Sequence, residues 1–518
     1  MWRFAKWCLS KSEQFSRTAS RVGQTGFIEF ANLLQYSRAD HAWIPFCHQL
    51  SAHLWIVSLT QSDSADSISS QTGQHSIASR IERLPLSGFH RRFIALISLG
   101  GWFDFYDIFM MAYIGAALQH SQMLTLEQFS HMIAAGFSGM FVGTIVFGMG
   151  SDYFGRRTSF VLMLLIYSVC TLFGAFAPNA WALIVWRGLA GVGIGAELVV
   201  IDTYVTEMLP SKARGRYVAI TQLVGFTAIP VVALLSKLLV PTEWLLDGWR
   251  WVMVIGGVGG LFAWYIRRRL PESPRWCEAR GRYREADTIM LEIEREVMSE
   301  TGRPLDEPQP VAVAQSEHMP IRELWQPAYR GRTLMLMVFH LLQTVGLYGF
   351  ANWAPTFLLK QGKSLGQSLE YGFLIALVSP IGPLIAVLTA EHLERKRLIV
   401  WLSLLMAASG LLFPLASEPL AIVGVGALLT IFSYWFSAVL HAYQAELFPT
   451  RARATGVGFT YSWSRLSAVF STLIIGLLLT KGVFAVFLFM AAAMAGVALV
   501  VGLFGPKTNA VVLERISE

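Results

Sequence analysis

Two carboxylates, Asp104 and Asp107, stand three residues apart inside the first long apolar run of the chain. At this spacing the two side chains share one face of a helix. A charged side chain within a bilayer is costly, so such residues face a wet cavity or a partner and indicate a functional site. With a helical rise of about 1.5 Å per residue, Asp107 lies roughly 20 Å beyond Arg92, near the middle of the membrane.

An arginine stands at a comparable depth in the fourth apolar run. Arg187 begins the sequence Arg-Gly-Leu-Ala-Gly-Val-Gly-Ile-Gly, in a helix that runs opposite to the first, so Arg187 and Asp107 can meet. A carboxylate beside an arginine ionises easily, whereas burial favours its protonated form, so movement of the arginine can switch a proton on and off. We therefore expect Asp107 and Arg187 to couple a proton, with Asp104 in support; a permanent structural ion pair is the alternative.

Two further acids, Glu197 and Asp202, follow in the same run. They are about 140° apart around a helix, so they cannot both face one partner. One can face a cavity and the other a helix interface. The glycines of this run, Gly191, Gly193 and Gly195, also fit close packing of helices alone.

The composition places these charges in a membrane protein. Of the 518 residues, 54% are hydrophobic and only 14% are charged, and the mean hydropathy is +0.49, which excludes an ordinary water-soluble protein. The formal charge of +7 does not indicate a nucleic-acid partner, because Lys and Arg gather at the ends of apolar segments. The four cysteines show no paired spacing, so we expect neither disulfides nor a metal site. We find no nucleophile–base spacing or phosphate loop that would indicate an enzyme.

Twelve apolar runs are long enough to cross a bilayer, and they divide six and six around a polar central stretch. The first six lie at about 93–118, 129–150, 158–177, 180–206, 217–240 and 250–266. The second six lie at about 333–359, 370–390, 397–415, 420–442, 455–479 and 483–504. The sequence therefore predicts an all-α membrane protein with two six-helix bundles, 84–266 and 333–505, a central loop, 267–332, and a tail, 506–518.

The first 83 residues differ in composition and bear Ser, Gln and His. Their one apolar stretch, about 42–59, is interrupted by a proline, two histidines and a glutamine, so we do not count it as a span. We expect this extension to be mostly disordered and cytoplasmic.

Basic residues fix the expected orientation. Clusters such as Arg156 with Arg157, 267–269 and 395–397 follow alternate spans, and the opposite turns carry few cations. The positive-inside rule then places these turns and both termini in the cytoplasm. The expected location is the plasma membrane, which in a bacterium is the inner membrane.

A tight charged turn follows the second span and forces its neighbours into an antiparallel hairpin. Its sequence is Gly148-x-x-x-Asp152-x-x-Gly155-Arg156-Arg157. The second half carries an imperfect repeat, with Glu391 at the position of the aspartate and Glu394 in place of the second glycine. Three more charged motifs stand at the same end of the spans: Glu207-x-x-Pro210-x-x-x-Arg214-Gly-Arg216, Pro271-Glu272-Ser-Pro-Arg275-Trp and Glu446-x-Phe-Pro449-Thr-Arg451.

Together with the Arg187 helix, these motifs resemble the sugar-porter and metabolite/proton symporter branch of the major facilitator superfamily, over about residues 84–505. The resemblance implies twelve transmembrane helices in two halves with inverted repeats and a pseudo-two-fold axis, and a substrate site near the midplane. Asp107 and Arg187 match the first-helix aspartate and fourth-helix arginine that pair in sugar/proton symporters.

The resemblance weakens at the substrate positions. Gln222 matches a fifth-helix glutamine that binds sugar hydroxyls, but Tyr348 replaces an expected asparagine and His441 an expected tryptophan. A phenol and an imidazole suit a carboxylate or a small aromatic acid. The expected substrate residues are Gln222, Gln343, Tyr348, Asn352 and His441, with Arg465 and His340 as further candidates. His340 can equally be a packing residue.

The charged motifs at the cytoplasmic ends are expected to pair between the halves and to hold an inner gate shut when the transporter faces outward. Solvated surface charge is the alternative. The expected gate residues are Asp152, Arg156, Arg157, Glu207, Arg214, Arg216, Glu272, Arg275, Glu446 and Arg451.

The sequence and the resemblance thus predict a proton-coupled symporter of a small organic or aromatic acid. It would work as a monomer in the lipid bilayer, without a cofactor. A proton-coupled sugar transporter on the same scaffold is the nearest alternative. A membrane sensor that signals through the N-terminal extension is an alternative of another class, and the intact Asp107 and Arg187 argue against it.

Overall fold

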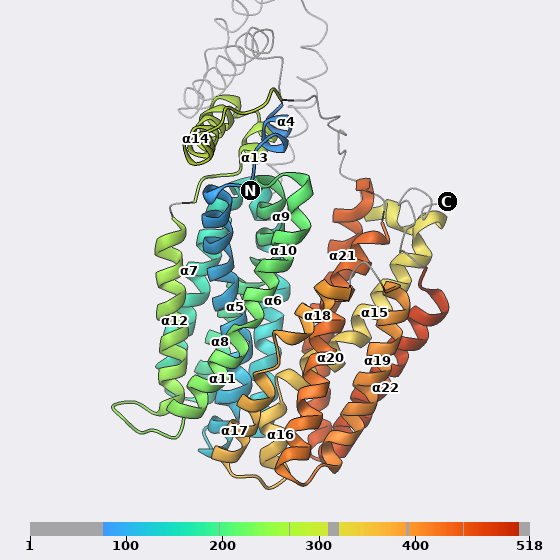
Figure 1. Ribbon diagram of the computed structural model, residues 1–518. Coiled ribbons are helices and arrows are strands. Elements are labelled where there is room, and N and C mark those ends of the chain that lie inside the picture. The colour runs from blue at the N-terminus through green and yellow to red at the C-terminus, as the bar shows by residue number, and fades with distance from the viewer. Residues whose placement is uncertain are drawn as a thin grey trace, which may run out of the picture. The chain divides into compact units, whose positions relative to one another are not determined.

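The computed structural model describes residues 76–195, 197–268, 270–308, 321–389, 393–448 and 450–506. Every described residue belongs to one compact unit, 75–518. The stretch 42–59 and the expected tail beyond residue 506 therefore lie outside the described residues. Regular structure in the described part is helical throughout (Figure 1).

The first bundle is built from helices that follow one another with short turns. They are α5 (Gly88–His120), α6 (Leu126–Phe154), α7 (Arg156–Ala175), α8 (Ala180–Ile194), α9 (Glu197–Met208), α10 (Ser211–Phe226), α11 (Ala228–Leu239) and α12 (Gly248–Arg267). The short helix α4 (Ile77–Glu82) precedes them, and the central loop adds α13 (Pro274–Ala279) and α14 (Tyr283–Thr301).

The second bundle repeats this plan. Its helices are α15 (Pro327–Ala351), α16 (Ala354–Lys360), α17 (Leu365–Ala376), α18 (Ile381–Thr389), α19 (Arg395–Leu412), α20 (Pro419–Glu446), α21 (Thr450–Leu479) and α22 (Val483–Phe504). Two short 3₁₀ helices, η1 (Ile321–Trp325) and η2 (Phe413–Leu415), complete the described elements.

Eleven helical stretches of the described residues are long and apolar enough to cross a membrane, against twelve expected from the sequence. The difference is the fourth span, because it is divided into α8, of 15 residues, and α9, of 12 residues. Residue 196, between these two helices, lies outside the described residues. The all-α membrane fold is thus confirmed.

The glycines of α8 allow close packing on α6. A Cβ at Gly191 would lie 2.2 Å from the Gly136 carbonyl oxygen, and one at Gly195 would lie 2.1 Å from that of Met140. Contacts this short are impossible for a side chain, so only glycine lets the two backbones approach. The packing explanation for this glycine run is therefore sufficient.

The two bundles contact each other mainly through α6 with α21, α11 with α17 and α5 with α16. Specific side-chain contacts join them at the end where α16 and α17 lie (Figure 1). These are the hydrogen bond from Gln119 Nε2 to Thr356 Oγ1 at 3.1 Å, the Lys237–Glu370 ion pair at 3.0 Å and the ring contact of Phe129 with Trp353 at 4.9 Å. We call the opposite end, which carries Arg156, Arg157 and α14, the basic end.

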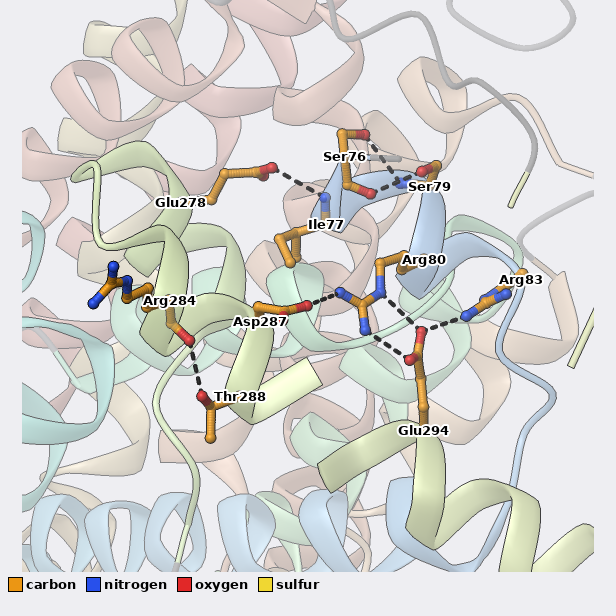
Figure 2. Close-up of polar contacts among 10 residues, drawn as sticks. All are labelled: Ser76, Ile77, Ser79, Arg80, Arg83, Glu278, Arg284, Asp287, Thr288 and Glu294. Carbon is orange, nitrogen blue, oxygen red and sulfur yellow. Dashed lines mark hydrogen bonds and ion pairs between the residues drawn. The ribbon is translucent and has the colours of Figure 1, made fainter. Parts of the chain in front are cut away.

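At the basic end, α4 is bound to α14 of the central loop by ion pairs, and we call this set of contacts the clasp. Arg80 of α4 lies 2.5 Å from Asp287 and 2.7 Å from Glu294, both on α14, and Arg83 lies 2.6 Å from Glu294 (Figure 2). The helix α4 thus lies before the boundary at residue 84 that the sequence predicts. The last part of the expected disordered extension is helical because acids some two hundred residues away supply its partners.

The charge of Glu294 makes this clasp sensitive to pH. Burial would raise the pKa of Glu294, but the hydrogen bonds and charges of Arg80 and Arg83 together hold that pKa below its ordinary value. A carboxylate whose pKa is lower in the folded state stabilises the fold above its ordinary pKa. This contribution is lost as the pH falls through the folded-state pKa.

We predict that Glu294→Gln releases α4. The amides of Ile77–Glu82 should exchange hydrogen about tenfold faster or more, because hydrogen bonds to charged groups are worth about 1.5–3 kcal/mol. Hydrogen–deuterium exchange with mass spectrometry measures this at neutral pH, and acidification of the wild type should produce the same rise. The control is Glu292→Gln, on the exposed face of α14. Unchanged exchange in Glu294→Gln would contradict the clasp.

Candidate functional site

A buried ion pair joins α5 and α8 in the first bundle. Arg187 Nη1 lies 2.8 Å from Asp107 Oδ2, and the two residues are 2% and 0% exposed. Thr171 Oγ1, on α7, donates to the other carboxylate oxygen at 2.8 Å. Both oxygens of Asp107 therefore accept a hydrogen bond, as a buried carboxylate requires. The sequence predicts this pair but not the contact of Thr171 with it. The one sequence feature of Thr171 is that it shares a helix face with Tyr167, four residues earlier.

A second group of charges lies one helical turn away along α5. Arg267 Nη1, on α12, lies 2.6 Å from Glu197 Oε1, on α9, and both side chains are fully buried. Asp104 is fully buried and interacts with both. Neither oxygen of Asp104 has a hydrogen-bond partner among the described residues. The structure thus brings together two acids that the sequence analysis considers separately.

From its sequence, Arg267 is expected only to orient the protein in the membrane, because it is the first of three consecutive basic residues at the end of a span. Such a run is typical of the membrane surface. In the structure, its guanidinium carbon lies 3.6 Å from the centroid of the Phe160 ring. Gly100 provides the space, since a Cβ there would lie 1.5 Å from Arg267 Nη2. Gly100 and Gly101, shortly before Asp104, are the sequence feature from which space for a large buried side chain could have been predicted.

The two acids of α9 have different surroundings. Glu197 forms an ion pair with Arg267 within the first bundle, whereas no ion pair of Asp202 is found among the described residues. One oxygen of Asp202, Oδ1, is buried without a hydrogen-bond partner among the described residues. This division agrees with their expected separation of about 140° around the helix.

In the second bundle, Arg465 of α21 is buried without an acidic partner in the part of the chain that the structure describes. It is 4% exposed, and its Nη1 lies 3.4 Å from Tyr348 Oη, on α15. Its guanidinium carbon lies 5.5 Å from the centroid of the Tyr461 ring. A buried guanidinium without a counter-ion is costly, so this position favours an anion.

Two histidines surround the same tyrosine. The ring centroids of His441, on α20, and His340, on α15, lie 5.7 and 5.4 Å from that of Tyr461. His441 is exposed, whereas His340 is fully buried. The structure therefore brings the predicted residues Tyr348, His441 and His340 together near Arg465. The ring at their centre, Tyr461, is absent from the sequence analysis, because an aromatic residue in an apolar helix carries no distinct signal.

The predicted amides do not form one cluster. Gln343 and Asn352 are 2% and 3% exposed, and an oxygen of each lacks a partner among the described residues. They stand about two and a half helical turns apart. Gln222 is half-buried on α10, one turn from Phe226, whose ring lies 4.7 Å from that of Tyr434 on α20. Gln222 is therefore placed toward the second bundle.

A small cavity of about 30 Å³ lies between the bundles. Its lining includes Phe109, Tyr113, Ser379, Thr430, Ser433 and Tyr434. No substrate residue predicted from the sequence lines it. A space of this size holds only a few water molecules, so an organic substrate cannot occupy it without movement of the surrounding helices.

At the basic end, Arg156 and Glu272 organise the turn between α6 and α7. Arg156 donates from Nε and Nη2 to Glu207 Oε1, at 3.1 and 2.9 Å. Glu272 accepts the backbone N–H groups of Arg156 and Arg157 at 2.8 and 3.0 Å, which caps the start of α7. Burial raises the pKa of Glu272, and these N–H groups offset the rise only in part.

The remaining gate residues also pair within a bundle. Glu82 of α4 lies 2.8 Å from Arg214 and 3.5 Å from Arg275, and Arg395 lies 3.2 Å from Glu446 in the second bundle. The sequence analysis expects pairs between the bundles instead, and the role of these residues as an inner gate stays a prediction. Arg216 is exposed, and the side chains of Asp152 and Arg451 lie outside the described part of the chain.

Comparisons with known proteins agree with this architecture. Residues 93–518 match the family described as sugar (and other) transporter. The chain is 32% identical over 439 residues to the putative metabolite transport protein YyaJ of Bacillus subtilis, covering 84% of this chain and 96% of that protein. It is also 32% identical over 443 residues to the niacin transporter NiaP of Acinetobacter baylyi, covering 85% of this chain and 99% of that protein. The structure of the xylose transporter XylE from E. coli, at 18% identity, matches with a TM-score of 0.67 over 82% of this chain and 100% of that chain, a likeness of fold alone.

The buried pair makes a prediction for stability. Arg187→Gln should destabilise the protein by about 3–5 kcal/mol, because it leaves Asp107 buried without its counter-ion. Adding Asp107→Asn should restore much of that loss. Thermal unfolding of the purified protein in detergent measures both variants, with Arg330→Gln, at an exposed position, as the control. Losses that simply add in the double variant would contradict a direct pair.

Proposed function

The chain belongs to the sugar (and other) transporter family of the major facilitator superfamily, and on this premise we propose that it carries a small organic acid across the membrane together with a proton. Its family and fold make it a multi-pass membrane transporter. The proposal adds the class of the substrate, with aromatic acids preferred, and the coupled ion.

The observation that carries the proposal is the buried Arg465. A carboxylate can bind a guanidinium through two parallel hydrogen bonds and would neutralise its charge. Tyr461 and His441 would then lie against the ring of an aromatic acid, because flat rings pack favourably face to edge. The similarity to a niacin transporter supports the same class of substrate, since niacin is an aromatic carboxylic acid.

The ion pair of the first bundle supports a proton as the coupled ion. While Asp107 is paired, Arg187 is occupied through Nη1, although its Nε has no acceptor among the described residues. A proton on Asp107 would weaken the pair and free Arg187 to attract the substrate anion. Proton and anion would then favour each other's binding, since linkage between two sites is reciprocal.

Orientation and location follow the distribution of charge. We place the basic end in the cytoplasm, because Arg156, Arg157 and Arg268 lie on that side of the spans. The bacterial relatives favour the plasma membrane as the location, which is the inner membrane in a bacterium with two membranes. Each chain contains both bundles, so we propose that the monomer is the working unit.

One observation favours a second candidate, a proton-coupled sugar transporter. Gln343 Oε1 and Asn352 Oδ1 are buried without a donor among the described residues, and sugar hydroxyls would supply donors. A neutral sugar would leave Arg465 without a counter-ion, however. The charge of the substrate therefore separates the two candidates.

We predict that Arg465→Gln weakens binding of nicotinate by about 10- to 150-fold, because a hydrogen bond to a charged group is worth about 1.5–3 kcal/mol. Isothermal titration calorimetry of the purified protein measures the loss. Binding of the neutral analogue nicotinamide should not change with this substitution, and Arg330→Gln should leave nicotinate binding intact. A loss that is equal for the acid and the amide would remove Arg465 from carboxylate recognition.

We predict that Asp107→Asn abolishes uphill accumulation of the substrate but leaves exchange across the membrane. The asparagine cannot take up or release a proton, so a pH gradient no longer drives transport. Uptake of radiolabelled nicotinate into proteoliposomes, with and without an imposed pH gradient, distinguishes the two activities. Accumulation in the variant at the wild-type level would exclude Asp107 from coupling.

A further inference from the structure

The group of charges around Asp104 is a separate ionisable site that the proposed coupling pair does not use. Its other members come from three elements: Glu197 from α9, Arg267 from α12 and Tyr167 from α7. The pair of Asp107 and Arg187 adjoins the site. Tyr167 Oη, like both oxygens of Asp104, is buried without a hydrogen-bond partner among the described residues. The site therefore has unused donors and acceptors in a place that water does not reach.

The charges of this site do not balance when both acids are ionised. Arg187 neutralises Asp107, and Arg267 neutralises Glu197 at 2.6 Å. The carboxylate of Asp104 then has no cation of its own. An uncompensated charge this deep in a membrane protein is costly, whereas one proton added to the site restores neutrality.

The hydrogen bonds that Arg267 donates also distinguish Glu197 from Asp104. Arg267 is committed to Glu197 and to the carbonyl oxygens of Ile97 and Leu96, at 2.7 and 3.2 Å. Its contact with Phe160 and the space left by Gly100 fix the guanidinium in this position. Asp104 is therefore close to the cation but receives no hydrogen bond from it.

We propose that Asp104 and Glu197 share one proton beside Arg267, and that this proton is passed to Asp107 during transport. The second part rests on the proposed proton symport, whereas the first does not. Asp104 and Asp107 are three residues apart on one helix face, so their carboxyl groups are neighbours. The site would hold one proton and supply it to the pair of Asp107 and Arg187. We call this site the proton store.

The transfer balances in atoms and charge. The O–H bond of the Asp104 carboxylic acid breaks and an O–H bond forms on Asp107, which releases Arg187. Asp104 is left as a carboxylate beside Arg267, and a proton from the aqueous side later restores it.

Infrared spectroscopy of the reconstituted full-length protein, without any substrate, tests the first part. The wild type at neutral pH should show the C=O stretching band of a buried protonated carboxylic acid. Asp104→Asn and Glu197→Gln should each remove an intensity equal to one carboxyl group, because one acid and one arginine then remain. Glu127→Gln, at an exposed position of α6, should leave the band unchanged.

The infrared result tests the shared proton independently of the proposed proton symport. A wild type without the band, or a band that persists in both Asp104→Asn and Glu197→Gln, would overturn the shared proton whatever the protein transports. Both Asp104→Asn and Glu197→Gln are measured, so that the test still applies if one of these variants does not fold. If the bands behave as expected but nicotinate is not transported, the proton store stands and the proposed substrate fails.

Transport by the same variants tests the second part. In proteoliposomes with an imposed pH gradient, Asp104→Asn should lower the accumulation of nicotinate at least tenfold, while Glu127→Gln accumulates it at the wild-type level. Accumulation by Asp104→Asn that equals the wild type, with the infrared band lost, would show that the shared proton is structural and would overturn its transfer to Asp107.

Discussion

Pairing of charges in a space that water does not reach is the interaction on which the rest of the structure depends. A buried charge is tolerated only beside an opposite charge and with its hydrogen bonds satisfied. In the first bundle, this constraint fixes α5, α8 and α7 around Asp107 and Arg187, and α5, α9 and α12 around Glu197 and Arg267. The bundle is therefore held by polar contacts at its centre as well as by packing of small residues.

The second bundle is different, because Arg465 has phenol and imidazole neighbours but no acidic partner among the described residues. The two bundles thus offer complementary groups, a carboxylate that can take up a proton and a guanidinium that lacks an anion. A substrate carboxylate would compensate the charge of Arg465, whereas a proton on Asp107 would release Arg187 from its ion pair. This asymmetry explains how two structurally similar halves can serve different roles in one transport cycle.

Features set by local sequence could be predicted, and features set by contacts between distant segments could not. Apolar run lengths gave the spans, and depth and direction gave the pair of Asp107 and Arg187. Arg267 escaped prediction because its burial depends on Gly100 in another helix, while its own neighbours are basic. The order of α4 likewise depends on Glu294, far along the chain. The pairing of charged turns between the halves stays a prediction, since spacing along the chain does not tell which turns meet.

The most direct test of the account is proton movement into proteoliposomes, followed with an internal pH dye while nicotinate, benzoate, a small aliphatic acid and xylose are added in turn. Protein-free vesicles correct for passive entry of the acids. The account predicts that an aromatic acid acidifies the interior beyond this background and that xylose does not. Acidification by xylose, or none by any acid although nicotinate binds, would contradict proton-coupled transport of an organic acid.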